Sequence, residues 1–280
     1  MLSAAFPGGN AVEDASERKK QEILNQAQMA VHLGEIPKTP VGVVERYRQL
    51  KHWKIFPKEY TFKCMAPFEG KRILDFGCGE GEISTQLALL GAQVTGVDIS
   101  PELVDLGRIR AKLDGVEDRI QFIAGDITTL NLPPQSFDHV LCYAVLHHVD
   151  LQETPPHLLK VLKPGGTMLM AEPTLFVRFL RKIRRLFPLY DPGTDTQEQF
   201  TQKEIGLVSA HFQESEVAYF NCFARLQRLF PNRDRIDEGH PFTRAAVLFL
   251  YYLDAAMIRV LPFMWRFYGN AVIVGRKASK

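Results

Sequence analysis

The chain has 280 residues, of which 46% are hydrophobic and 24% are charged, and its formal net charge at pH 7 is +2. This composition is typical of a soluble globular protein with one large or two small domains. A charge so close to neutral leaves no face-wide excess of Lys and Arg, so no nucleic-acid partner is predicted.

The cysteines and the N-terminal residues indicate the compartment. Cys64, Cys78, Cys142 and Cys222 lie far apart and form no C-x-x-C pair, so we predict neither a disulfide framework nor a metal site. The first residues lack the basic start and long apolar core of a signal peptide. No stretch reaches the roughly 18 uncharged apolar residues of a membrane span. A reduced, cytoplasmic protein is therefore expected.

The N-terminal part is predicted to be an arm with a helical cap over residues 1–57, followed by the main domain over 58–280. Within the arm, residues 1–12 read as disordered and residues 13–31 as polar and helix-prone. The next segment has apolar and aromatic residues at mixed helical spacing and is interrupted by Pro57.

From residue 72 the pattern changes to alternating strands and helices. The predicted strands are "KRILDFG", "AQVTGVDIS", "RIQFIAGDI", "FDHVLCYAVLHHV" and "TMLMAEP", and the helices between them include "EISTQLALLG" and "PELVDLGRIRAKLDG". Strands separated by helices of this length pair in parallel through right-handed crossovers. The fold class predicted is therefore α/β, with a doubly wound sheet. "ESEVAYFNCF" and "NAVIVGRK" are predicted as late strands.

Two insertions, residues 174–200 and 224–268, are predicted to form a lid or an interfacial region. Residues 176–187 place apolar side chains on one helical face and basic side chains elsewhere. This pattern is typical of an element that lies on an anionic membrane surface, and equally of a lid packed on its own domain. Residues 245–268 are apolar and aromatic, which favours a lipophilic acceptor or an interfacial location; a core helix or a homodimer interface are the alternatives.

A glycine loop follows the first strand. Gly77, Gly79 and Gly81 form G-x-G-x-G, with Asp75 two residues before the first glycine. The dinucleotide fingerprint is G-x-G-x-x-G, and its helix N-terminus faces a pyrophosphate. A carboxylate beside the loop would repel a pyrophosphate and suits a cationic sulfonium or ammonium group. The loop therefore disfavours NAD or FAD.

Two further acids end the next two strands, Asp98 in "VTGVDIS" and Asp126 in "FIAGDI". Ligands of open α/β sheets bind at this edge, where an acid commonly accepts ribose hydroxyls. A single acid at a strand end is more often a helix N-cap. Three acids on three successive strands indicate a nucleoside site instead, with Asp126 placed to meet an adenine amino group.

The stretches "ILDFGCGEG", "VTGVDIS", "IAGDI", "FDHVLCYAVLHHV" and "LKPGG", in this order, resemble the class I S-adenosylmethionine-dependent methyltransferases. The most similar branch is the small-molecule one that includes quinone-biosynthesis methyltransferases. The resemblance implies a mostly parallel seven-stranded sheet with an antiparallel last strand, and S-adenosylmethionine as cofactor. The residues that it implies are Asp75 with Gly77, Cys78, Gly79 and Gly81 for the methionine part, Asp98 for the ribose, Ile99, Asp126 and Ile127 around the adenine, and Cys142 and Tyr143 on the path to the sulfonium. Cys78 itself reads as a small residue that fills a tight turn.

Methyl transfer from a sulfonium needs alignment and exclusion of water, and it needs a base only where the acceptor must lose a proton. His147 and His148 follow the fourth strand, and at most one of them is expected to act as that base. We therefore predict methylation of a small, lipophilic acceptor, with O-methylation narrowly preferred over C- or N-methylation. The alternatives are a catalytically inactive methyltransferase-like binding protein and a nicotinamide-dependent oxidoreductase.

Overall fold

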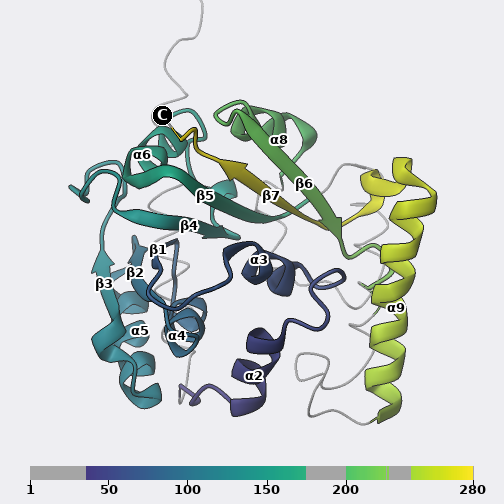
Figure 1. Ribbon diagram of the computed structural model, residues 1–280, viewed down its shortest axis with the longest axis horizontal. Helices are drawn as coiled ribbons and strands as arrows, with labels where there is room; N and C mark the ends of the chain where they lie inside the picture. The colour runs from purple at the N-terminus through teal and green to yellow at the C-terminus, as the bar shows by residue number, and fades with distance from the viewer. Residues whose placement is uncertain (1–35, 175–199, 225, 227–240, 280) are drawn as a thin grey trace, which may run out of the picture.

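The computed structural model describes residues 36–174, 200–224, 226 and 241–279 (Figure 1). The arm expected over residues 1–31 and the amphipathic helix expected over 176–187 lie outside these ranges. The described residues form a central sheet with helices on both faces, and a long C-terminal helix stands at one edge of the molecule (Figure 1).

The sheet has seven strands in the order β3-β2-β1-β4-β5-β7-β6. β7 is antiparallel to β5 and to β6, and the other neighbours pair in parallel. The predicted fold class, including the antiparallel last strand, is confirmed. The strands are β1 (Arg72–Phe76), β2 (Gln93–Asp98), β3 (Ile120–Ala124), β4 (Phe137–Tyr143), β5 (Leu162–Pro173), β6 (Glu214–Phe220) and β7 (Asn270–Arg276).

Two strand boundaries differ from the sequence prediction. The fourth strand was expected over residues 137–149, but β4 ends at Tyr143 because Ala144 adopts a left-handed backbone with φ of 55°. A short 3₁₀ turn, η2 (Leu146–His148), follows it. The fifth strand begins at Leu162, five residues before the predicted start, because the "KPGG" segment is already part of β5.

The helices divide between the two faces of the sheet. α3 (Pro57–Met65), α4 (Glu82–Leu89) and α5 (Pro101–Asp114) share one buried apolar cluster with Ile73, Leu141 and Val272. α6 (Thr154–Val161) and α8 (Gln202–Ser209) share a second cluster with Leu74 and Val140. Ile73 and Leu74 are neighbours in β1 and enter opposite clusters, as the two-residue period of a strand requires.

The remaining helical elements are α2 (Val41–Gln49), η1 (Glu117–Arg119), α9 (Pro241–Val260) and η6 (Pro262–Phe267). A third, smaller cluster joins the connection between α2 and α3 to α9, through Phe56 and Tyr251, whose ring centroids are 4.1 Å apart. Tyr47 and Leu50, from the end of α2, belong to the first core cluster. The cap over residues 36–57 therefore packs on the same core as the sheet.

Candidate cofactor and acceptor site

The glycine loop lies between β1 and α4, and its backbone conformation requires glycine. Gly77, Gly79 and Gly81 have φ values of 74°, 51° and 74°. A Cβ atom on Gly77 would lie 2.3 Å from Val145 Cγ2, and one on Gly81 would lie 2.6 Å from Phe122 Cζ. A Cβ atom on Gly79 would meet nothing within 4 Å. The loop is thus packed at its two ends and open at its centre, where a ligand can approach the backbone.

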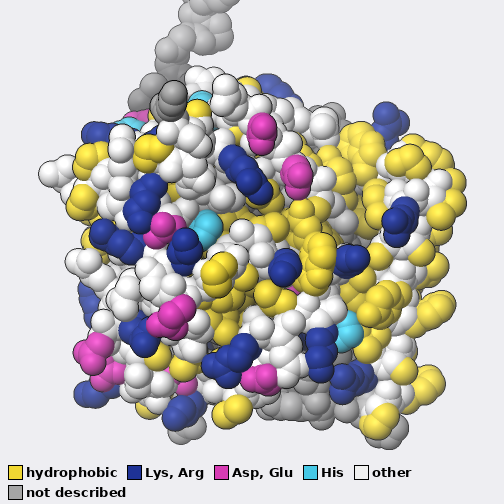
Figure 2. All heavy atoms as spheres, viewed as in Figure 1, with side chains coloured by type: hydrophobic (Ala, Val, Ile, Leu, Met, Phe, Trp, Pro, Cys, Tyr) yellow, Lys and Arg dark blue, Asp and Glu magenta, His cyan; other side chains and the backbone are white. Residues whose placement is uncertain are grey.

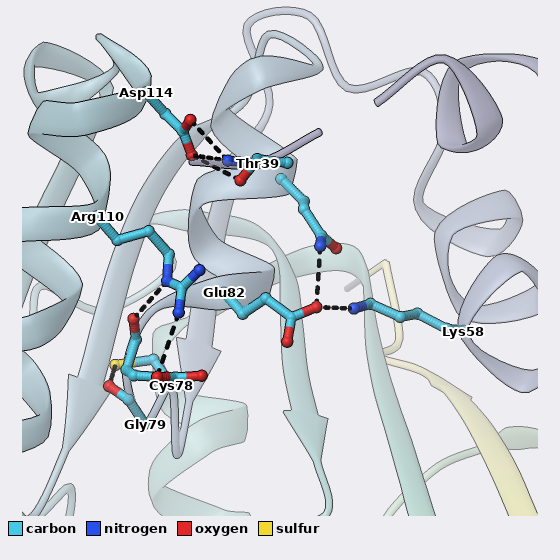
Figure 3. Close-up of polar contacts among 9 residues, drawn as sticks. Thr39, Lys58, Cys78, Gly79, Glu82, Arg110 and Asp114 are labelled. Carbon is cyan, nitrogen blue, oxygen red and sulfur yellow. Dashed lines mark hydrogen bonds and ion pairs between the residues drawn. The ribbon is translucent and has the colours of Figure 1, made fainter. Parts of the chain in front are cut away.

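Two contacts hold the loop in place, and Figure 3 shows the one made by Arg110. The N–H of Gly79 donates to Asp98 Oδ2 at 2.8 Å. Arg110, on α5, donates from Nε to the carbonyl oxygen of Glu80 at 3.1 Å and forms an ion pair with the Glu80 carboxylate at 3.2 Å. The loop is therefore preorganised before any ligand binds.

Cys78 sits within this loop and is buried. Its thiol Sγ lies 3.7 Å from the carbonyl oxygen of Gly79, and burial raises the pKa of the thiol well above its usual value. A thiol held in its neutral form is a poor nucleophile. Cys78 therefore fills the turn, as the sequence interpretation has it.

Asp75, at the end of β1, is fully buried beneath the loop. The Ser84 hydroxyl, from the first turn of α4, donates to Asp75 Oδ2 at 2.6 Å. Burial raises the pKa of Asp75 to about 6, while the Ser84 hydrogen bond and the Lys58 ammonium act in the opposite direction. A desolvated carboxylate at this position favours a cationic partner.

Lys58 is a candidate residue that the sequence reasoning missed. It lies in the first turn of α3, and its Nζ contacts Oε1 of Glu82, the first residue of α4, at 2.8 Å (Figure 3). This ammonium lowers the pKa of Glu82, and its field also reaches Asp75 and Tyr143. An amino-acid tail carries both an ammonium and a carboxylate, and the pair Asp75 and Lys58 offers a partner of the opposite charge to each.

The acids that end β2 and β3 lie at the same rim of the sheet. Asp98 is buried, and its Oδ1 accepts a hydrogen bond from Ser100 N–H at 3.0 Å. Asp126 follows β3, and its Oδ1 accepts from the Thr128 hydroxyl at 2.9 Å. Both acids therefore shape turns as well as facing the rim. Ile99 is half-buried beside Asp98, and Ile127 is buried beside Asp126.

Cys142 and Tyr143 end β4 on different faces of the sheet. Cys142 is fully buried in the second cluster, with α6 and α8, whereas Tyr143 packs on the first cluster, with α3 and α4. Burial raises the pKa of Tyr143 to about 12, so the phenol stays neutral. The structure thus leaves Tyr143 as the rim residue of the pair, and Cys142 belongs to the core.

The turn after β4 brings His147 against Glu172, at the end of β5. Glu172 is fully buried, and its Oε1 accepts hydrogen bonds from Val145 N–H at 3.0 Å and Leu146 N–H at 2.8 Å. Its Oε2 lies 2.6 Å from His147 Nδ1. When Glu172 accepts this hydrogen bond, a neutral His147 carries its hydrogen on Nδ1 and has its lone pair on Nε2.

His147 Nε2 is buried and has no hydrogen-bond partner among the described residues. Val145, two residues earlier, is the side chain that closes on Gly77, so this turn touches the cofactor loop. His148 is exposed, and its ring centroid is 3.9 Å from that of His147. Of the two predicted histidines, His147 is the one that the buried Glu172 carboxylate orients, with a buried ring nitrogen left over.

Comparisons with known proteins identify the family. A family model described as a methyltransferase domain matches residues 67–227, more than half of the chain. The ubiquinone biosynthesis O-methyltransferase of Schizosaccharomyces pombe is 36% identical over 146 residues, which cover 49% of this chain and 52% of the relative. The demethylmenaquinone methyltransferase of Clavibacter sepedonicus is 37% identical over 113 residues, which cover 40% of this chain and 45% of the relative. The chain thus spans about half the length of these curated relatives.

Solved structures extend the likeness over the fold. The magnesium protoporphyrin IX methyltransferase of Synechocystis PCC 6803, with bound S-adenosylhomocysteine, superposes with a TM-score of 0.52 at 17% identity, covering 91% of this chain and 94% of that one. The open glycine backbone, the buried acids and the Lys58 cation suit a nucleoside with an amino-acid tail. The chain therefore belongs to the methyltransferase domain family, and it has the fold of the class I S-adenosylmethionine-dependent methyltransferases, whose cofactor is S-adenosylmethionine.

Proposed function

We propose that this chain transfers the methyl group of S-adenosylmethionine to a hydroxyl oxygen of a small, lipophilic acceptor. The observation that carries the proposal is the pair of Glu172 and His147, which leaves the buried Nε2 without a hydrogen-bond partner among the described residues, on the turn whose Val145 packs against Gly77 of the cofactor loop. A hydroxyl loses its proton on methylation, whereas methylation of an already deprotonated carbon or of a neutral amine does not need a base in the same step. A preset base therefore favours O-methylation.

The residues of this chain act by orientation and proton removal. S-adenosylmethionine supplies the activated methyl group when it is bound. Asp75 and Lys58 would hold the two charged groups of its tail, and Asp98 would hold its ribose hydroxyls. Glu172 fixes the ring of His147, so that Nε2 can take the acceptor's proton during an in-line transfer. The half-buried rim limits competition from water.

Two observations support a lipophilic acceptor of quinone type. The curated relatives bear the names ubiquinone biosynthesis O-methyltransferase and demethylmenaquinone methyltransferase. Aromatic side chains from separate elements also lie together. The ring centroid of Tyr60, on α3, is 5.4 Å from that of Phe220, on β6, and 6.1 Å from that of Trp53, on which Tyr60 stacks. We also propose a cytoplasmic location, because four free cysteines suit a reducing compartment. We further propose that residues 176–187 contact an anionic membrane.

The test is an assay of S-adenosylhomocysteine release with a catechol, an aniline and a hydroquinone as acceptors. We expect the hydroxyl acceptors to gain a methyl group. His147→Gln should lower kcat by about 10²–10⁴-fold, and the matched exposed variant His148→Gln should keep most of the rate. Equal losses of kcat in His147→Gln and His148→Gln would contradict the role of His147 as the base.

Cofactor binding separates the alternatives. Calorimetric titration should show binding of S-adenosylhomocysteine and none of NADH. Tight S-adenosylhomocysteine binding with no turnover on any acceptor would favour an inactive binding protein, and binding of NADH alone would favour an oxidoreductase.

A further inference from the structure

The helix α9 is apolar on the side that faces away from the protein as well as on the side that faces it. Its inward face buries Val247 and Tyr251 against the α2–α3 connection. Phe249, Tyr252 and Val260 follow one another at spacings of three and eight residues on the outward face, and they are 66%, 52% and 74% exposed. The large exposed apolar side chains of α9 and η6 are Phe242, Phe249, Tyr252, Val260, Leu261, Phe263 and Phe267.

We call the outward surface that carries these side chains the α9 face. Figure 2 shows hydrophobic side chains gathered over α9, at the right of the view, with Lys and Arg side chains beside them. A soluble monomer rarely exposes so many large apolar side chains together unless something covers them.

Contacts on the inward side fix the orientation of α9. Asp254, on the inward side, is buried and accepts hydrogen bonds from the backbone N–H groups of Cys222, Phe223 and Ala224 at 2.7–3.0 Å. The Tyr268 hydroxyl donates to the backbone carbonyl of Asp254. By length and composition α9 is apolar enough to cross a membrane, and only 17% of its apolar 18-residue stretch is buried against the rest of the described structure. With its inward face bonded along the domain, α9 can lie on a bilayer but cannot be inserted across one.

Within residues 241–268, the exposed charged side chains are all basic. Asp254 is the only acidic residue in 241–268, and it is buried on the opposite side. Arg259 and Arg266 are exposed at the C-terminal end of the face. His52 Nδ1 lies 3.2 Å from the Tyr252 hydroxyl, which brings the exposed Lys51 and Lys54 to the same side of α9.

We propose that the α9 face docks on an anionic lipid bilayer, with α9 parallel to the membrane surface, its aromatic side chains among the headgroups and its cations against the lipid phosphates. Apolar burial and headgroup attraction reinforce each other in such elements. A second copy of the chain fits less well, because a symmetric pair would bring the same arginines together with no exposed acid in 241–268 to oppose them.

Docking would also place the reaction beside the lipid phase. β5 and β6 end at the same rim, where Thr174 N–H donates to Gly269 O at 2.9 Å and Gly269 N–H donates to Phe220 O at 3.0 Å. Glu172 lies two residues before Thr174 on that rim. The hydrogen bonds at the end of β5 therefore connect the segment after α9 to the strand that carries Glu172. Only this consequence, the delivery of a lipophilic acceptor from the bilayer, rests on the proposed function.

The experiment is sedimentation of the full chain with vesicles of phosphatidylcholine containing about 30% phosphatidylglycerol, at low salt. We expect wild type to sediment with these vesicles and less with phosphatidylcholine alone. Phe249→Glu/Phe263→Glu should lower the partition coefficient by at least about tenfold. Arg259→Glu/Arg266→Glu should lower it on anionic vesicles only. The control Ile109→Glu/Leu113→Glu alters two apolar side chains of α5 that are 51% and 48% exposed, and it should behave as wild type.

Three results would overturn the proposal. They are a wild type that stays in the supernatant, a Phe249→Glu/Phe263→Glu variant that sediments like wild type, and a dimer without lipid that the same variant dissociates. S-adenosylhomocysteine titration of each preparation separates this question from the reaction. Unchanged affinity shows that the fold and the cofactor site are intact whatever the vesicles show.

Discussion

The two halves of the sheet differ in the longest sequence separation that their contacts bridge. In the half built from β1, β2 and β3, Ser84 bonds Asp75 nine residues away, and Gly79 bonds Asp98 nineteen residues away. In the half built from β4 to β7, Glu172 meets His147 over 25 residues, and Thr174 meets Tyr268 over 94. The contacts around the glycine loop bridge up to 30 residues, as between Arg110 and Glu80, whereas those of the acceptor half also join the end of β5 to a segment 94 residues away.

This difference separates two kinds of function. A local site can be shared by many enzymes that use one cofactor, because a single strand–loop–helix unit carries it. A site made from distant segments can change its acceptor without changing the cofactor loop. Variants in the two halves should therefore affect cofactor affinity and turnover separately.

The largest effect is expected from Glu172→Gln, in the acceptor half. Glutamine can accept from Val145 N–H and Leu146 N–H through its oxygen, but its amide donates toward His147 Nδ1. The proton of His147 would then move to Nε2, and the base would be lost. We expect kcat to fall by about 10²–10⁴-fold, with S-adenosylhomocysteine affinity unchanged by calorimetry. A variant with a normal rate would show that Glu172 only shapes the turn.

The next effect belongs to the cofactor half. Asp98→Ala should weaken S-adenosylhomocysteine binding by about 1–3 kcal/mol, because it leaves ribose hydroxyls and the Gly79 N–H unpaired. Calorimetric titration measures the change. Asp118→Ala removes an exposed acid outside the loop and serves as the control. If both variants bind equally well, the ribose contact must be assigned elsewhere.

Lys58→Met should have a smaller effect, about 1 kcal/mol, because the ammonium is partly solvated. The loss should appear with S-adenosylhomocysteine and not with methylthioadenosine, which lacks the amino-acid tail. Lys63→Met, on the exposed side of the same helix, should change neither affinity. An equal loss for both ligands would mean that Lys58 supports the packing of α3 on α4 instead.

The smallest effect concerns pH. The pKa of Asp75 is about 6, so at pH 5 only about a tenth of this carboxyl remains ionised. A neutral Asp75 cannot pair with the ammonium of the cofactor's tail. We expect S-adenosylhomocysteine affinity to fall by up to about tenfold from pH 7 to pH 5. Asp75→Asn should bind more weakly at pH 7 and lose this pH dependence; a wild-type affinity that is flat over the range would contradict the assignment.

Most of the fold could be predicted from the sequence because its signals are contiguous. Each strand of β1 to β3 ends in an acid or a glycine turn within a few residues, and the three strand ends fall at one rim as expected. The end of β4 could not be predicted in this way, because no sequence pattern indicates the left-handed backbone of Ala144.

The acceptor half was harder to predict for a physical reason. Glu172 reads locally as an acid at the end of a strand, and only its partners after β4 give it a role. Lys58 shares α3 with a second lysine, Lys63, and only the folded arrangement of α3 and α4 shows which of them meets Glu82. The sequence did contain a signal for Glu172. It is the one acid in the apolar stretch "MLMAEP", and a buried carboxylate needs hydrogen-bond donors around it.

The position of β7 has a consequence for how the protein is made. β7 is the last strand in chain order, yet it lies between β5 and β6 and pairs with both along its length. Until the ribosome has released residues 270–276, β6 has no neighbour in the sheet and β5 keeps one edge unpaired. During synthesis the nascent chain thus carries two open strand edges, and it depends on rapid arrival of β7, or on a chaperone, to avoid pairing with other chains.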